Sequence, residues 1–199
     1  MELSPLARER LEKAGELSSE EKEKLRHEEE LTAILSDFYT GKLNDEGLWT
    51  KMKTYIDNGQ EELVKEMQTR LVYTLSLGGS DADFKNYSSG ILILETLKSP
   101  NRYPEIETSI KTVEKTRQEY EEERTRTFDA MKSGIGDQVR KAAEQMARQN
   151  RAGAGMVDIE SSIEASVRNS QQWRQFVVKY EKEHGRKFED LINRLAKLL

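Results

Sequence analysis

The residues whose spacing best suits metal chemistry are Glu181 and His184, near the end of the chain. A Glu-x-x-His pair places both side chains on one helix face, and helical di-iron sites use two such pairs with two further glutamates. A second pair is missing, because the only other histidine, His27, has Lys24 rather than a glutamate three residues before it. We therefore interpret His184 as a side chain that interacts with the dipole of its helix end, and we expect no metal site.

Two glycine pairs, Gly134-Ile135-Gly136 and Gly153-Ala154-Gly155, have the spacing found in nucleotide-binding loops. Neither pair follows a predicted strand, and neither is followed by Lys-Ser or Lys-Thr. Both pairs therefore lack the flanking elements that a phosphate-binding loop needs. A helix kink and a turn explain these glycines better. We expect no cofactor.

Catalytic residues do not stand out in the sequence. No serine occupies a nucleophile elbow, and no carboxylates occur where burial would perturb their pKa values. The absence of cysteine excludes thiol nucleophiles, thiolate metal sites and disulfides. We expect a non-enzymatic protein; the alternative is an enzyme or small-ligand binder with a pocket in the N-terminal bundle, near Trp49, Tyr55 and Tyr87.

Basic residues cluster in the second half of the chain and form a candidate phosphate-binding patch: Arg140, Lys141, Arg148 and Arg151, with Arg168 and Arg174 further along. Carboxylates are interspersed at Asp137, Glu144, Asp158, Glu160 and Glu164. Binding to nucleic acid needs several cations that nearby carboxylates do not neutralise. The patch is therefore more typical of a solvated helix face, and a nucleic-acid-associated protein is the alternative function.

Apolar and small residues recur at steps of four and three from residue 159 to residue 184: Ile159, Ile163, Ser166, Ser170, Trp173, Val177, Tyr180 and His184. This spacing is typical of a coiled-coil seam, since a heptad repeat keeps one face of a helix toward a partner helix. Either the chain's own long helix or a second subunit can fill it. Ile159, Ile163, Trp173, Val177 and Tyr180 are the candidate partner or self-association seam, and we expect a homodimer that uses part of it.

A long helix is predicted from Pro104 to Asn150. Its apolar positions recur with a mean step of about 3.6 residues, the period of a straight α-helix. Shorter amphipathic segments precede it, with capping signals at Ser18, Asn44 and Ser80. Gly185 should end the helix that carries the seam, leaving a short last helix from Lys187 to Leu199.

These elements predict an all-α protein: an N-terminal helical bundle, then a long antiparallel, coiled-coil-like hairpin and a short closing helix. The expected organisation is an acidic bundle over 1–99, a proline-containing boundary at 100–104, and the hairpin with its last helix over 105–199, packed with the bundle as one unit. Residues 1–100 hold 13 Lys/Arg against 20 Asp/Glu, a charge of −7; residues 101–199 hold 19 against 17, a charge of +2.

The function expected from this composition is protein–protein interaction, as an adaptor, assembly factor or co-chaperone-like scaffold. Charged residues make up 35% of the chain, and the long amphipathic helices come without a catalytic motif. No apolar run is long enough to span a membrane, and the N-terminus lacks the apolar core of a secretory signal. We therefore expect a cytoplasmic protein with another protein as its partner and no membrane association.

Overall fold

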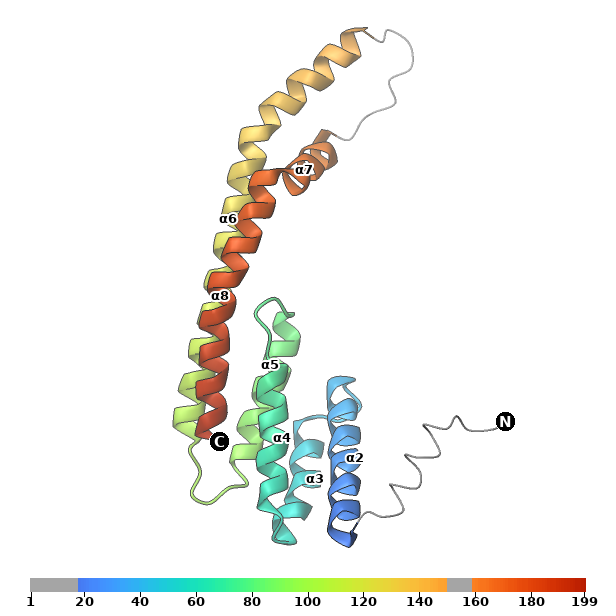
Figure 1. Ribbon diagram of the computed structural model, residues 1–199, viewed down its shortest axis with the longest axis vertical. Helices are drawn as coiled ribbons and strands as arrows, with labels where there is room; N and C mark the ends of the chain where they lie inside the picture. The colour runs from blue at the N-terminus through green and yellow to red at the C-terminus, as the bar shows by residue number, and fades with distance from the viewer. Residues whose placement is uncertain (1–17, 150–158) are drawn as a thin grey trace, which may run out of the picture. The chain divides into compact units, whose positions relative to one another are not determined.

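The computed structural model describes residues 18–149 and 159–199, and this part of the chain consists of helices joined by loops, without a strand (Figure 1). It contains seven helices, numbered α2 to α8: α2 (Ser19–Tyr39), α3 (Asp45–Asp57), α4 (Glu61–Thr74), α5 (Asp81–Glu95), α6 (Tyr103–Gln149), α7 (Ile159–Asn169) and α8 (Gln171–Leu198). The predicted all-α class is confirmed.

Three of the first four helices begin at the predicted caps. Ser18 and Glu21 form a reciprocal capping box at the start of α2, with the Ser18 amide donating to Glu21 Oε2 over 2.8 Å. The side chains of Asn44 and Ser80 accept backbone N–H groups at the starts of α3 and α5. These caps satisfy amides that a helix start leaves without an intrahelical partner, so the sequence locates these boundaries well.

The chain divides into two compact units, and the first contains helices α2 to α5. Its core consists of side chains at helical spacing, including Phe38, Leu48, Met67, Leu71 and Ile91, all fully buried. Apolar burial in α2 begins only at Leu31, because the front half of that helix is highly charged.

Gly90 lets α5 approach its neighbours closely within this unit. A Cβ atom built on Gly90 would lie 2.9 Å from Phe38 Cζ and 3.2 Å from Leu71 Cδ1. Any larger residue would therefore collide with the core. The glycine stands inside the helix despite its poor helix propensity because the packing needs the space.

The core of the first unit also holds a polar pair that the apolar pattern does not reveal. Gln68 and Glu95 are 0% and 1% exposed. The Gln68 amide donates to the Ile91 carbonyl oxygen over 2.9 Å and to Glu95 Oε2 over 3.1 Å. Glu95 also accepts the Arg102 backbone N–H and pairs with Lys98 over 3.0 Å. Gln68 Oε1 is buried without a partner in the described chain, but the other bonds satisfy the Gln68 amide nitrogen and the Glu95 carboxylate and join α4, α5 and the segment after α5.

The second unit contains α6, α7 and α8, together with the short segment 76–79. Helices α6 and α8 are antiparallel, because Tyr120 stacks on Tyr180 while Phe128, further along α6, contacts Trp173, earlier in α8. The predicted long helix is thus a continuous α6 that reaches Gln149 through Gly134 and Gly136, and the predicted hairpin is present (Figure 1).

Two details of the predicted hairpin are wrong. The segment with the heptad spacing is not one helix: it is interrupted at Ser170, where α7 ends and α8 begins. Conversely, Gly185 does not end a helix, because α8 runs through it to Leu198, and no separate closing helix exists. Phe188, Ile192 and Leu195 are buried along the same helix, which explains why the chain continues as helix past the glycine.

None of the described helices combines the length and the apolar character needed to cross a bilayer.

Candidate functional site

The outward side of α8 carries a cluster of cations that we call the α8 basic face: Arg174, Lys179, Lys182 and Arg186. All four residues are exposed. Together with Gln171, Gln175 and Val178, the first three line a shallow depression of about 690 Å³. The helix period places these residues opposite Trp173 and Tyr180, which are buried on the inner side of the helix.

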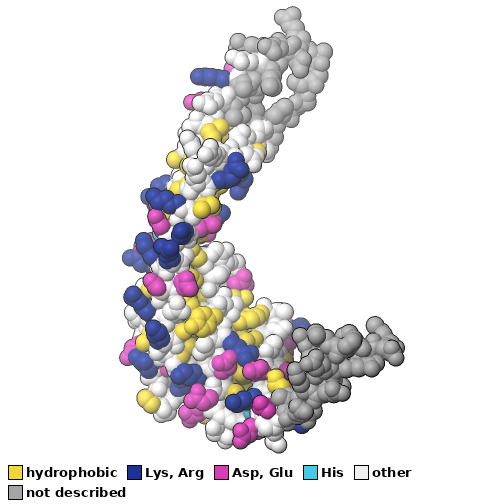
Figure 2. Space-filling model, in the orientation of Figure 1, with side chains coloured by type: hydrophobic (Ala, Val, Ile, Leu, Met, Phe, Trp, Pro, Cys, Tyr) yellow, Lys and Arg dark blue, Asp and Glu magenta, His cyan; other side chains and the backbone are white. Residues whose placement is uncertain are grey.

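Most cations of this face form no ion pair within the described chain, although Glu181 and Glu183 are exposed on the same helix. Among the residues that the structure describes, Lys179, Lys182 and Arg186 form no ion pair, and Arg174 donates to the Asn169 carbonyl oxygen over 2.8 Å. Lys and Arg side chains recur along the hairpin on the side drawn in Figure 2. The α8 basic face therefore presents four exposed cations from one continuous helix, three of them without an ion pair among the described residues.

An apolar residue lies at the centre of the α8 basic face. Val178 is 69% exposed, one of three large hydrophobic side chains that stand out in this way among the described residues. Isolated exposed valines are ordinary. Here the valine is surrounded by cations. An apolar residue that can be buried by a partner, with charged residues around it, resembles the apolar core and polar rim of a protein interface.

Aromatic rings on the inner side hold α8 against α6. Phe128 meets Trp173 edge-on with a centroid distance of 5.0 Å, and Tyr120 stacks on Tyr180 at 5.4 Å. Tyr180 also donates to Glu123 Oε2 over 2.9 Å. Burial, followed by this hydrogen bond, raises the pKa of Tyr180 well above its usual range. The hairpin therefore has a specific aromatic core that fixes which face of α8 points outward.

A second cross-hairpin contact involves Lys132 on α6. Its Nζ lies 2.6 Å from Glu160 Oε1 and 2.9 Å from Glu164 Oε1, both on α7. The two carboxylates hold the pKa of Lys132 above its ordinary value. The ion pairs of Glu160 and Glu164 with Lys132 therefore hold α7 against α6.

The residues predicted as a seam lie mostly inside this hairpin. Ile163, Trp173 and Tyr180 are buried, whereas Val177 is partly exposed and the side chain of Ile159 lies outside the described residues. The heptad count missed Val167, which is fully buried, and included Ser166, which is exposed. The break at Ser170 shifts the register between α7 and α8, and nothing in the spacing signalled it. Self-association through these residues stays a prediction.

The predicted phosphate-binding patch is only partly described. Arg140 and Lys141 are exposed on α6, and Arg140 Nη1 lies 3.6 Å from Asp137 Oδ1. The side chains of Arg148 and Arg151 lie outside the described residues. The basic cluster that the structure does describe is on α8, and a helical count of uncompensated cations over residues 174–186 could have found it.

The Glu181 and His184 pair belongs to the aromatic layer of the hairpin. The Tyr120 hydroxyl lies 3.5 Å from Glu181 Oε1. The centroid of the His184 ring lies 4.1 Å from the centroid of the Tyr180 ring. The described residues include no group of three or more potential metal ligands. Since α8 continues past Gly185, His184 is not at a helix end, and the predicted interaction with a helix-end dipole is wrong.

A comparison with protein-family models matches residues 49–197, about three quarters of the chain, to a family of unknown function (DUF6657). The chain belongs to this family. Comparisons with curated proteins and with solved structures give no match. The DUF6657 match begins inside α3 and extends to the last turn of α8, so it includes the whole α8 basic face.

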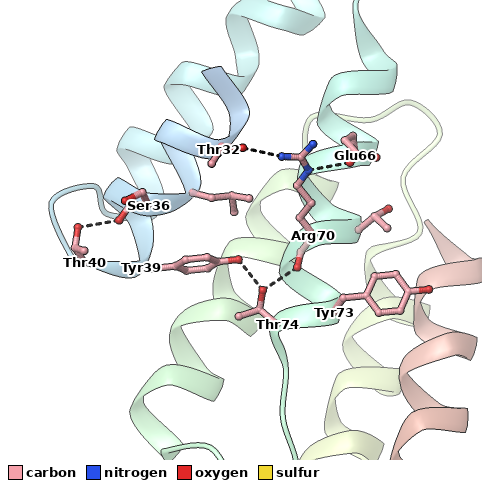
Figure 3. A pocket seen from close by; sticks show the side chains of 10 residues that line it. Thr32, Ser36, Tyr39, Thr40, Glu66, Arg70, Tyr73 and Thr74 are labelled. Atoms are coloured by element: carbon pink, nitrogen blue, oxygen red, sulfur yellow. Dashed lines mark hydrogen bonds and ion pairs between the residues drawn. The ribbon is translucent and has the colours of Figure 1, made fainter. Parts of the chain in front are cut away.

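The first unit carries a groove of about 620 Å³ between α2 and α4 (Figure 3). Arg70 crosses it, donating to Glu66 Oε1 over 2.8 Å and to Thr32 Oγ1 over 3.2 Å. The Tyr39 hydroxyl lies 2.6 Å from Thr74 Oγ1, which in turn donates to the Arg70 carbonyl oxygen. The groove is therefore bridged by hydrogen bonds between its own walls, and its α2 wall lies outside the DUF6657 match.

The three aromatic residues proposed to mark an N-terminal pocket lie in separate places. Trp49 donates to Thr96 Oγ1 over 3.1 Å, and Tyr55 donates to Glu30 Oε2 over 2.9 Å. Tyr87 packs edge-on against Tyr39 and so adjoins the groove without lining it. The structure does not bring the three together around one cavity.

Proposed function

We propose that this member of the DUF6657 family is a cytoplasmic, non-enzymatic adaptor that binds an acidic helical segment of a partner protein on the α8 basic face. The observation that carries the proposal is the set of four exposed cations on one helix, three of them without any ion pair in the described chain. Such a face attracts an acidic partner and orients it during encounter.

The shape and chemistry of the face favour a helix as the ligand. Residues 171–182 extend over about 18 Å, which is three turns of a helix, and they form a shallow depression rather than a deep cavity. An amphipathic helix docks on such a surface through apolar anchors at helical spacing, with charges at the rim. Val178 supplies the apolar contact, and the cations around it select an acidic rim on the partner.

A nucleic acid is the competing ligand for the same cations. The phosphate backbone would gain nothing from the exposed Val178, and four cations neutralise only a few phosphates. Exposed carboxylates at Glu181 and Glu183 flank the face, and the whole chain carries a formal charge of −5. The apolar contact at Val178 and the small number of cations support a protein partner over nucleic acid, whereas the flanking carboxylates and the net charge disfavour both kinds of acidic ligand equally.

The test compares two double charge reversals, each of which changes the net charge equally. Lys179→Glu/Lys182→Glu disrupts the α8 basic face, and Arg140→Glu/Lys141→Glu on α6 is the matched control. The probe is a fluorescently labelled, helical peptide rich in Glu and Leu, with binding followed by anisotropy. We expect salt-sensitive binding by wild type and by the control, and a loss of at least tenfold in the α8 variant.

A random DNA duplex is titrated in parallel. We expect no detectable binding to it at physiological salt. Binding to DNA that is lost with Lys179→Glu/Lys182→Glu, without binding to the acidic peptide, would replace the proposed partner by nucleic acid. Equal peptide binding by both variants would refute the proposed surface.

A further inference from the structure

A small pocket lies at the junction of the three hairpin helices, and it is separate from the α8 basic face. It has a volume of about 150 Å³. Its walls, which we call the arginine pocket, come from α6, the last turn of α7 and the first turn of α8: Arg124, Thr125, Phe128, Arg168 and Trp173. The pocket lies at the break around Ser170, where α7 ends and α8 begins beside α6.

Aromatic rings position one of the two arginines. The guanidinium carbon of Arg168 lies 5.0 Å from the centroid of the Phe128 ring, and Phe128 in turn meets Trp173 edge-on. Stacking occupies the face of a guanidinium and leaves its N–H groups, which lie in the plane, available to an acceptor. Arg168 is thus held in a defined orientation while its donors stay accessible.

The second arginine has a donor without an acceptor. Arg124 Nε is enclosed by protein and has no hydrogen-bond partner in the described chain. The nearest carboxylate contact of this side chain is from Nη1 to Glu121 Oε2, at 3.6 Å, which is longer than a hydrogen bond. Because Nε is closed to solvent, only the terminal Nη groups of Arg124 can donate to an anion in the pocket.

The electrostatic setting of the pocket favours an anion. None of its five lining residues is acidic. The neighbouring carboxylates Glu160 and Glu164 are engaged by Lys132. The positive end of the α8 dipole and the negative end of the α7 dipole meet at this junction and oppose each other, so the two guanidinium groups provide the positive charge of the pocket.

We propose that the arginine pocket binds a phosphate group. Two arginines can supply several charge-assisted hydrogen bonds to the oxygens of phosphate, and the Thr125 hydroxyl lines the same space. A water molecule occupies about 30 Å³ in the liquid, so the pocket has room for one tetrahedral anion with a few waters and none for a whole nucleotide. The ligand is either free phosphate or the phosphate end of a larger ester that extends outward.

The experiment uses the intrinsic fluorescence of Trp173. The chain has two tryptophans, so Trp49→Phe leaves Trp173 as the only reporter. Inorganic phosphate and phenyl phosphate are titrated separately into this protein at constant ionic strength, up to about 10 mM, which nearly saturates a site with a Kd of about 1 mM. We expect a saturable fluorescence change, with chloride at the same ionic strength producing none.

Substitution then assigns the response to the pocket. Arg168→Gln and Arg124→Gln should each weaken phosphate binding by about tenfold or more, because each removes charge-assisted hydrogen bonds. Arg140→Gln removes an equal charge elsewhere on α6 and should leave the affinity unchanged. Circular dichroism of each variant confirms that the hairpin is folded.

The two probes distinguish the source of the phosphate. Tighter binding of phenyl phosphate indicates an ester that also contacts the aromatic wall, and equal binding indicates free phosphate. The proposal is overturned if neither compound gives a saturable change, or if Arg140→Gln weakens binding as much as Arg168→Gln does. The acidic-peptide assay with Lys179→Glu/Lys182→Glu is independent of this outcome.

Discussion

At the scale of single residues, Gly90 shows how one missing side chain permits close helix packing. Gly90→Ala should destabilise the protein, because the added methyl group would meet Phe38 at 2.9 Å and Leu71 at 3.2 Å. Overpacking of a core costs about 1–3 kcal/mol, which exceeds the gain of about 1 kcal/mol in helix propensity. Urea unfolding should show a lower midpoint, whereas the slope of the unfolding free energy against urea concentration should not change.

Gly185→Ala is the matched control for Gly90→Ala. Gly185 also lies inside a helix, but a Cβ atom there would have no neighbour within 4 Å. The same substitution should therefore stabilise the protein by up to about 1 kcal/mol. Destabilisation by Gly185→Ala would contradict the continuous α8, since it would indicate the left-handed conformation that favours glycine at a helix end.

Tyr55 links stability to alkaline pH through its hydrogen bond to Glu30. Burial and this 2.9 Å bond raise the pKa of Tyr55 to about 12, against about 10 for an unperturbed tyrosine. The neutral phenol therefore stabilises the fold fully below pH about 10, and that contribution is lost as pH rises from about 10 to about 12.

The corresponding measurement is the free energy of unfolding between pH 9 and pH 12, in wild type and in Tyr55→Phe. The variant should lose less stability over this range, because its residue 55 has no proton to release. Some loss should remain, since burial also raises the pKa values of Tyr120 and Tyr180. Identical pH dependence in the two proteins would show that Tyr55 does not contribute.

At the scale of elements, Ser170 separates α7 from α8. Its Oγ accepts the Trp173 backbone N–H over 3.1 Å, and its carbonyl oxygen accepts the Arg174 N–H over 3.2 Å, so it caps α8. Ser170→Ala should therefore cost about 0.5–2 kcal/mol of stability in thermal or urea unfolding.

Ser166→Ala tests whether that cost comes from capping. Ser166 is exposed, and its hydroxyl donates to the Ser162 carbonyl oxygen inside α7. Its replacement should change stability by no more than about 0.5 kcal/mol. Equal losses from the two substitutions would indicate that α7 and α8 form one helix through Ser170, as the heptad spacing predicts.

The sequence predicted the boundaries of the short N-terminal helices better than those within the hairpin. Ser18, Asn44 and Ser80 are recognisable because a side-chain oxygen must accept an amide at a helix start. Gly185 misled because a helix can continue through a glycine at a cost of about 1 kcal/mol, which burial of the residues beyond it offsets. The role of Ser170 was missed because the heptad spacing alone does not distinguish a serine within a helix from a serine that caps the next helix.

The candidate surfaces depended even more on tertiary structure. Spacing places Arg174, Lys179 and Lys182 on one side of a helix, but only the structure shows that Lys179 and Lys182 form no ion pair with the described residues. The arginine pocket joins residues 124 and 168, which are distant in sequence and become neighbours only through the antiparallel register. No local pattern carries that information.

At the scale of the molecule, the central question is whether the buried side of α8 is complete within one chain. Aromatic contacts within the chain run from Phe128 to Trp173, from Trp173 to Phe176, and from Phe176 to Tyr180. Trp173 is only 7% exposed without any second subunit. The hairpin therefore buries its own aromatic side, and a homodimer would have to use other surface in addition.

Trp173→Ala distinguishes these two arrangements. If Trp173 packs only inside the hairpin, its loss leaves a cavity and should cost about 3–5 kcal/mol, with a melting temperature that does not depend on protein concentration. If it also belongs to a dimer interface, the melting temperature of wild type should rise with concentration, and the variant should dissociate. We expect the cost in stability to dominate, because the contacts of Trp173 with Phe128 and Phe176 are already present in one chain. Sedimentation of wild type and variant at tens of micromolar measures the association directly. A folded Trp173→Ala protein with the stability of wild type would contradict the aromatic core, and a wild type that is strictly monomeric would exclude the homodimer.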